Sequence, residues 1–307
     1  MTHTARLNGC AVLSYQMQLI VRCFNCAIRY FCVLTAEREV WYNILRNREI
    51  FDLPTELQWE IAARAGQTGE YGWYLKNGVA TQGTLQNVGD FSWNKDNAGG
   101  DCHPVGGKAP NLWGIYDTSG EEWEWCRDEW NGNNTAYHGL PAEIPYSAGG
   151  ASANRIFRGG YYASGSNTSM RPSLRNSSPA SEGPNTPAVG VRLCCIPGGR
   201  AVPEDATGTP LGAASAVGDA MVVDVSAGAS AANFPVAHYC NIDMGYFNCD
   251  TYKTTKIAFR KVKAGTYTVG DAEIGDAGWL ATAVTVNKDY YIGLFPVTWR
   301  QWYQTAG

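Results

Sequence analysis

The stretch PNLWGIYDTSGEEWEWCRDEW, residues 110–130, joins a glycine turn to a short strand pattern. Ser119-Gly120 marks the turn, because glycine tolerates the left-handed backbone that tight turns require. Trp123 and Trp125 follow with one residue between them, and this alternation predicts a strand with both rings on one face. The stretch therefore indicates a strand that large aromatic side chains anchor just after a tight turn.

A helix signal precedes this stretch. Residues 53–66, LPTELQWEIAARAG, predict a short helix in which Thr55 and Gln58 form a capping box and Gly66 ends the last turn. Residues 67–112 are rich in Gly, Asn and Trp without a helical period, so we expect a long structured loop there.

Strand signals follow the stretch 110–130. Residues 155–162, RIFRGGYY, predict a strand broken by a glycine pair, and residues 188–195, AVGVRLCC, predict a closing strand. Residues 256–270 predict two further short strands, and residues 283–307 predict strands that run into a helix beginning near Thr298. Together these elements indicate short strands and helices joined by much irregular loop structure.

Composition narrows the functional class. The chain has 307 residues, a net charge of −4 and only 17% charged residues, and it carries no basic footprint for nucleic acid. Residues 11–34 are apolar, but polar and charged side chains interrupt them, so we expect neither a membrane span nor a clear signal peptide. The sequence does not indicate the cellular compartment.

Four motifs in order carry a family resemblance. They are LPTELQWEIAARAG, PNLWGIYDTSGEEWEWCRDEW, RIFRGGYY and VGVRL. In this order they resemble the formylglycine-generating enzyme (sulfatase-modifying factor) family, and four ordered motifs are far more specific than any one of them. The resemblance implies an α+β, C-type-lectin-like fold with much irregular loop structure.

The order of the remaining segments departs from the family. Residues 1–48 are an extension of unclear origin, 49–196 resemble the C-terminal two thirds of the family domain, and 197–235 are expected to be a linker. Residues 236–307 resemble the N-terminal third but come last. Either the chain is a slice of a tandem array or it is a circular permutant, and we favour closure of one fold in space. Pairing of 264–270 with 190–194 would mark that closure.

The resemblance implies a calcium site in the turn 117–124. The expected ligands are the side chains of Asp117 and Glu124 and the main-chain carbonyls of Gly120 and Glu122. Hard oxygen ligands from a tight turn suit calcium, and two carboxylates offset its charge. The alternative is that Asp117 caps the turn and Glu124 pairs with an arginine.

The resemblance also implies two redox cysteines, five positions apart, after the glycine pair. Aligned on Gly159-Gly160, these positions fall on Ser164 and Ser169, and no cysteine lies between Cys126 and Cys194. A hydroxyl neither binds Cu(I) as a thiolate does nor carries redox equivalents. We therefore expect no bound copper and lean against an enzyme.

The preferred hypothesis is a non-catalytic ligand- or protein-binding module whose partner is an unknown protein or small ligand. The segment after the glycine pair is rich in Tyr, Ser, Asn and Gly, which suit a binding surface. The expected surface residues are Tyr161, Tyr162, Asn167, Arg171 and Arg175. Two alternatives stay open: a formylglycine-generating oxidase that uses displaced thiols, and a truncated array fragment without function of its own. The arginines could equally pair with carboxylates inside the fold.

Overall fold

The computed structural model describes residues 49–130, 154–179, 189–197, 217–231, 234–271 and 281–306. The expectations for the N-terminal extension, including its apolar stretch 11–34, lie outside the described residues. Among the described residues, no helix is long and apolar enough to cross a lipid bilayer. The architecture is rich in sheet with few helices, in agreement with the predicted α+β class.

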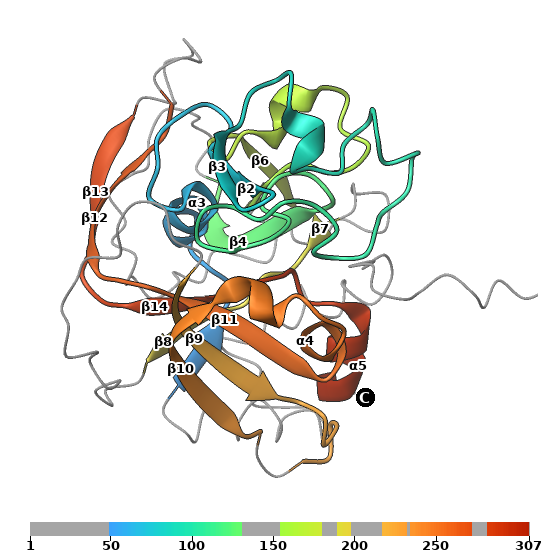
Figure 1. Ribbon diagram of the computed structural model, residues 1–307, viewed down its shortest axis with the longest axis vertical. Helices are drawn as coiled ribbons and strands as arrows, with labels where there is room; N and C mark the ends of the chain where they lie inside the picture. The colour runs from blue at the N-terminus through green and yellow to red at the C-terminus, as the bar shows by residue number, and fades with distance from the viewer. Residues whose placement is uncertain are drawn as a thin grey trace, which may run out of the picture.

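A six-stranded antiparallel sheet forms the larger layer (Figure 1). Its strands, in spatial order, are β1 (Glu49–Asp52), β8 (Cys194–Pro197), β14 (Tyr290–Gly293), β11 (Lys256–Val262), β9 (Val217–Asp224) and β10 (Val236–Asp243). Tyr291 and Ile292 of β14 pair with Cys195 and Cys194 of β8. Strands from the two ends of the described chain therefore share one sheet.

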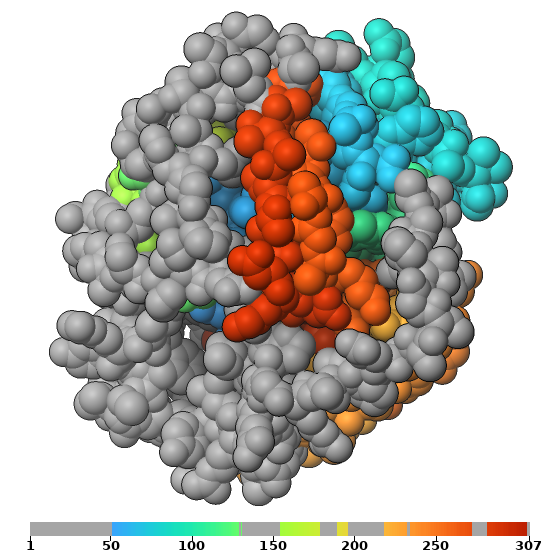
Figure 2. Space-filling view, turned by 90° about the vertical axis from the view of Figure 1, so that its left-hand side faces the viewer, coloured from blue at the N-terminus to red at the C-terminus, as the bar shows by residue number. Residues whose placement is uncertain are grey.

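A four-stranded sheet forms the second layer. Its order is β6 (Arg175–Pro179), β5 (Asn154–Arg158), β4 (Trp123–Glu129) and β7 (Val189–Gly190), with only β4 and β7 parallel. Two separate hairpins complete the strands: β2 (Trp73–Lys76) with β3 (Val79–Gln82), and β12 (Gly265–Val269) with β13 (Thr282–Val286). The β12–β13 hairpin crosses one face of the molecule as a continuous band (Figure 2).

The predicted helix 53–66 is confirmed as α3 (Glu56–Arg64). Thr55 Oγ1 accepts a hydrogen bond from Gln58 N, and Gln58 Oε1 accepts one from Thr55 N, which is the expected capping box. Ala65 ends the helix in the left-handed region with φ 51°. The remaining described helical elements are η1 (Val88–Asp90), η2 (Asn167–Met170), η3 (Met244–Phe247), α4 (Thr251–Thr254) and α5 (Trp299–Ala306).

The six-stranded sheet has a hydrophobic cluster on each face. One cluster includes Ile61 of α3, Cys194 and Ile292, while the other includes Trp123, Cys195 and the aromatic residues around them. Neighbouring residues of a strand point to opposite faces, so the vicinal cysteines belong to different clusters. Trp123 and Trp125 lie in the same cluster, which confirms the predicted shared face. The inner strands of the sheet are thus buried on both faces, whereas the edge strand β10 is largely exposed.

Three expectations need correction. The range 197–235, predicted as a linker, contains β9, whose apolar residues 220–223 are buried in the six-stranded sheet between β11 and β10. Residues 264–270 do not pair with 190–194: β12 pairs with β13 and packs beside α3, and β14 pairs with β8 instead. The range 67–112 also contains the β2–β3 hairpin. In each case the apolar pattern was a strand of four or five residues or an isolated apolar island. Such a short run does not show from its periodicity which structure it adopts or where it pairs.

Candidate functional site

The turn 117–124 has an unusual backbone that its sequence explains. Asp117, Gly120 and Glu121 all have positive φ, at 56°, 74° and 64°. A Cβ on Gly120 would lie 2.1 Å from the carbonyl oxygen of Trp93, so only glycine fits there. The Gly120 N–H donates to the carbonyl of Gly159, which ties this turn to the glycine pair that precedes the serines.

Glu124 is buried at the start of β4, and both of its carboxylate oxygens accept hydrogen bonds. Its carboxylate accepts two hydrogen bonds from Arg192, Nη2 to Oε1 at 2.6 Å and Nε to Oε2 at 2.8 Å. The indole N–H of Trp59 also donates to Oε2. Arg192 donates further to the carbonyls of Tyr116 and Gly293. The sequence alternative for Glu124, an internal arginine partner, is therefore present in the structure.

The other acidic residues of the turn are buried with less compensation. The Gly106 N–H donates to Asp117 Oδ2 at 2.6 Å, and burial raises the pKa of Asp117 to about 6. The His103 N–H donates to Glu121 Oε1, and burial together with the Asp117 charge raises the pKa of Glu121 to about 9. Burial raises the pKa of Glu122 well above its usual value, and neither oxygen of its carboxyl has a hydrogen-bond partner.

The two serines at the expected thiolate positions differ in their surroundings. Ser164 is buried, and its hydroxyl accepts a hydrogen bond from the Tyr161 N–H at 3.1 Å. Ser169 is partly exposed and lies in η2. Gly160 has φ 74°, and a Cβ there would lie 2.5 Å from the Ser169 carbonyl oxygen. The glycine pair therefore allows this segment to fold back on itself.

The expected surface residues fall into two groups. Tyr161, Tyr162 and Asn167 are partly exposed, and the Asn167 amide donates to Asp96. Arg171 forms an ion pair with Glu70. The side chain of Arg175 is only 5% exposed and forms a double hydrogen bond with Glu56, so it lies inside the fold rather than on the expected surface.

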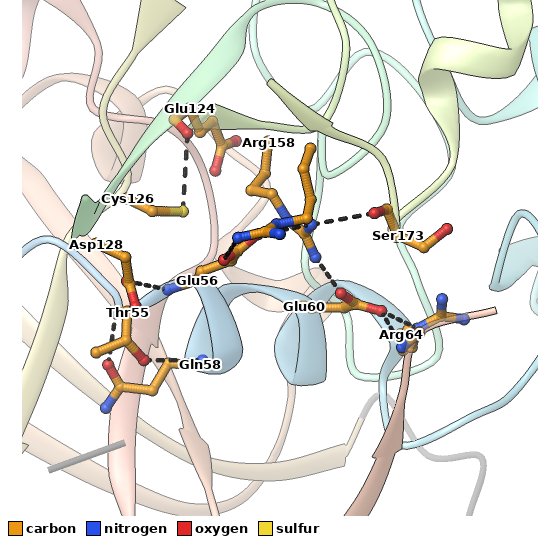
Figure 3. Close-up of polar contacts among 12 residues, drawn as sticks. Thr55, Glu56, Gln58, Glu60, Arg64, Glu124, Cys126, Asp128, Arg158 and Ser173 are labelled. Atoms are coloured by element: carbon orange, nitrogen blue, oxygen red, sulfur yellow. Dashed lines mark hydrogen bonds and ion pairs between the residues drawn. The ribbon is translucent and has the colours of Figure 1, made fainter. Parts of the chain in front are cut away.

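A buried row of alternating charges lies beside these residues, and the sequence analysis did not identify it (Figure 3). Arg158 contacts both Glu56 and Glu60 from the neighbouring β5, and Arg64 Nε lies 2.7 Å from Glu60 Oε1. Asp128 Oδ2 accepts a hydrogen bond from the Glu56 N–H at the start of α3. The spacing of Glu56, Glu60 and Arg64 along one helix face was the available signal.

The five free thiols in the described part of the chain do not gather at the serines. Cys126 belongs to the cluster around Trp59, whereas Cys194 and Cys195 belong to two other clusters, one on each face of the six-stranded sheet. Cys240 and Cys249 are exposed. The described thiols therefore form no pair within one cluster.

Comparison with known proteins identifies the family. The family model described as "Sulfatase-modifying factor enzyme 1-like domain" matches residues 20–195, more than half of the chain. The chain belongs to this family. The match begins at residue 20, so it includes much of the range 1–48 in which the sequence analysis had found no family likeness.

Individual relatives are similar over a limited length. A formylglycine-generating enzyme of Streptomyces coelicolor is 35% identical over 116 residues, which are 36% of this chain and 35% of that protein. A formylglycine-generating enzyme of Thermomonospora curvata is 31% identical over 116 residues, 36% of this chain and 38% of that protein. The chain thus spans little more than a third of these relatives. Among solved structures, Treponema denticola variable protein 1 is 31% identical with a TM-score of 0.37, over 47% of this chain and 46% of that one.

Proposed function

We propose that this chain is a non-catalytic binding module on a sulfatase-modifying-factor scaffold. The observation that carries the proposal is the pair of serines at both positions where the family pattern expects thiolates. The Ser164 hydroxyl accepts a hydrogen bond from the main chain and is buried. A neutral hydroxyl cannot replace a thiolate as a copper ligand or as a redox carrier. The partner is a protein or a small ligand.

The positions of the described thiols support this proposal. A displaced oxidase centre would need two sulfur atoms close to each other and to the serine segment. Cys126, Cys194 and Cys195 are divided among three clusters, and burial raises the pKa of the Cys126 and Cys194 thiols. A buried thiol with a raised pKa is a poor thiolate donor at neutral pH.

A copper-dependent oxidation assay tests the proposal. The purified chain is incubated with Cu(I), oxygen and a cysteine peptide, and aldehyde formation is measured by mass spectrometry. We expect no turnover from the natural chain. The matched comparison is the double variant Ser164→Cys, Ser169→Cys, which restores both sulfur atoms and is expected to bind Cu(I). Copper-dependent aldehyde formation by the natural chain would refute the proposal.

A calcium ion in the turn 117–124 is the second part of the proposal. The hydrogen bond from Gly106 uses only Oδ2 of Asp117, which leaves Oδ1 for a cation. Glu124 is held rigidly by Arg192, and the carbonyls of Gly120 and Glu122 belong to the same turn. These oxygen donors fit the preference of calcium, which would add positive charge among the four buried acidic side chains of the turn. Bound calcium would stabilise the turn and the loop attached to it.

We also propose that residues 236–307 complete one C-type-lectin-like domain with residues 49–196. The pairing of β14 with β8 supports this, because it joins the two parts through main-chain hydrogen bonds. A protease site inserted within 201–216 tests it. After cleavage, the two fragments should elute together on size exclusion and separate only in denaturant. Separation under native conditions would favour two independent parts.

A further inference from the structure

The first residue of α3 contacts both ends of the serine segment. This segment, residues 159–174, joins β5 to β6, so that Arg158 precedes it and Arg175 follows it. Glu56 Oε1 accepts hydrogen bonds from Arg158 Nη1 at 3.0 Å and from Arg175 Nε, and Oε2 accepts one from Arg175 Nη2 at 2.8 Å. One carboxylate therefore bridges the strand that enters the segment and the strand that leaves it.

The two arginines lie opposite each other in the sheet. Arg158 and Arg175 are direct partners in the antiparallel pairing of β5 with β6, at the end of the pairing that is next to the serine segment. The side chain of Arg158 is fully buried, and that of Arg175 is 5% exposed. Like charges directly opposite each other on two strands repel, and burial reduces the screening by solvent. Without a carboxylate between them, the two strands would be pushed apart at this end.

The neighbouring carboxylate of α3 has different partners. Glu60 lies one turn after Glu56, forms ion pairs with Arg158 and Arg64, and accepts a hydrogen bond from the Gly270 N–H. It therefore contacts the strand that enters the serine segment, and its other partners lie elsewhere in the fold. Both carboxylates are buried, which makes Glu60 a natural comparison for Glu56 (Figure 3).

The turn 117–124 also contacts the serine segment. The Gly120 N–H donates to the Gly159 carbonyl at 2.7 Å, and Ser119 Oγ donates to the Met170 carbonyl at 3.0 Å. These contacts involve the first residue and the middle of the segment. The direct connection between its two flanking strands is made by Glu56 from outside the segment.

We propose that Glu56 is the positioning residue of the serine segment. Its carboxylate holds the two flanking strands together and thereby keeps the segment in one conformation before a ligand binds. The inference rests on the proposed binding function, because it explains how that surface is kept rigid. A surface that is ordered in advance loses less conformational entropy on binding, and its affinity is higher for that reason.

Hydrogen exchange of the folded full chain tests this inference. The N–H groups of Ser164, Ser169 and Leu174 donate to main-chain carbonyls of the same segment at 3.0–3.1 Å, so these amides are protected while the segment is ordered. Exchange of residues 159–174 is measured by mass spectrometry at pH 7. We expect Glu56→Gln to raise the exchange rates about tenfold or more, because exchange through local opening follows the local free energy and not the global stability.

Glu60→Gln is the matched control. It removes the charge of a buried carboxylate from Arg158 but leaves the Glu56 bridge in place. The exchange rates of the segment should therefore change less than about threefold, although the free energy of unfolding falls in both variants. A similar rise in Glu56→Gln and Glu60→Gln would overturn the inference. So would unchanged exchange in Glu56→Gln, since the turn 117–124 would then be sufficient to hold the segment.

A double variant separates positioning from a general loss of stability. In Arg175→Met the positive charge opposite Arg158 is absent and Glu56 no longer bridges two strands. Adding Glu56→Gln to Arg175→Met should consequently change the exchange rates of the segment by less than about threefold. This comparison also decides the question if Glu56→Gln alone does not fold. A rise of about tenfold in the Arg175→Met background would overturn the inference.

The exchange experiment involves neither copper nor a ligand, so its result is independent of the copper assay. Unchanged exchange in Glu56→Gln rejects the inference and leaves the binding module standing. Copper-dependent oxidation by the natural chain rejects the proposed function, whereas raised exchange in Glu56→Gln would still show that Glu56 orders the serine segment.

Discussion

Removal of the Glu60 carboxylate should be among the most damaging single changes to this fold. Glu60 is fully buried, and its Oε1 accepts from Arg64 Nε at 2.7 Å and from the Gly270 N–H at 2.8 Å. Its Oε2 forms an ion pair with Arg158, which is also fully buried. The substitution Glu60→Ala leaves two buried guanidinium groups short of one negative charge.

The magnitude follows from what is left unpaired. Removing one partner of a buried ion pair costs about 3–5 kcal/mol, because the remaining charge stays desolvated. The lost hydrogen bond to Gly270 adds about 1 kcal/mol. We therefore expect Glu60→Ala to lower the free energy of unfolding by about 4–6 kcal/mol at neutral pH. The exposed pair Lys76–Asp90 provides the matched control: Asp90→Ala should cost less than about 1 kcal/mol.

The stability cost of Glu60→Ala should decrease as the pH is lowered. Burial alone would raise the pKa of Glu60, but the charges of Arg158 and Arg64 outweigh it and hold the pKa below its usual value of 4.5. A lowered pKa in the folded state means that the stabilisation is present above pH 4.5 and is lost as the pH falls through the lower, folded value. The difference between the natural chain and Glu60→Ala should therefore shrink in acid.

Urea unfolding followed by tryptophan fluorescence measures both quantities. The chain has 11 tryptophans, and Trp59 lies on the same helix as Glu60. Unfolding curves for the natural chain, Glu60→Ala and Asp90→Ala are recorded at pH 7 and at successively lower pH. A cost of less than about 1 kcal/mol at pH 7 would refute the reasoning, because it would mean that water or a rearrangement screens the buried charges.

Three further predictions follow from the turn and from the start of α3. Calcium should raise the melting temperature of the natural chain in differential scanning fluorimetry, and Asp117→Ala should remove most of this increase. An equal increase in the natural chain and in the variant would place any bound calcium elsewhere. Gly120→Ala should lower the free energy of unfolding by more than about 3 kcal/mol, because the position has a positive φ and the new Cβ would meet the Trp93 carbonyl. Gly78→Ala, which has a positive φ but open space around it, should lower it by about 1 kcal/mol. Equal losses for the two variants in urea unfolding would contradict the steric argument. Burial followed by the Glu56 charge raises the pKa of Asp128 to about 6, so its contribution to stability is present in acid and lost as the pH rises through about 6. Asp128→Asn should consequently gain stability relative to the natural chain as the pH rises from about 4 to about 6, with little further change above that, and parallel pH profiles of the two melting temperatures would argue against this.

Local signals in the sequence predicted the parts of the fold that depend on neighbouring residues. The capping box of Thr55 and Gln58 and the shared face of Trp123 and Trp125 depend on contacts within a few positions, and the structure has both. The same holds for the helix after Thr298, whose Oγ1 accepts from the Gln301 N–H. The family, too, was recognisable from ordered motifs, and the family match agrees with it.

Local sequence signals could not predict which distant segments pair with each other. The register of β14 against β8, and the position of β9 inside the sheet, depend on which apolar faces can be buried together, and a strand of four to eight residues does not specify its neighbour. The prediction that 264–270 would pair with 190–194 was wrong for this reason, because many short strands of similar composition compete for one sheet edge.

The same distinction between local sequence and tertiary structure applies to the candidate site. The sequence by itself determined the chemistry available in the serine segment, since a serine at 164 and at 169 excludes a thiolate in any conformation. Only the tertiary structure decided which acidic side chains have partners: Glu124 lies within reach of Arg192, 68 positions away, while the neighbouring Glu122 has none. The physical reason is that electrostatic compensation of a buried charge depends on distance in space, and the chain brings those groups together only when both sheets have formed.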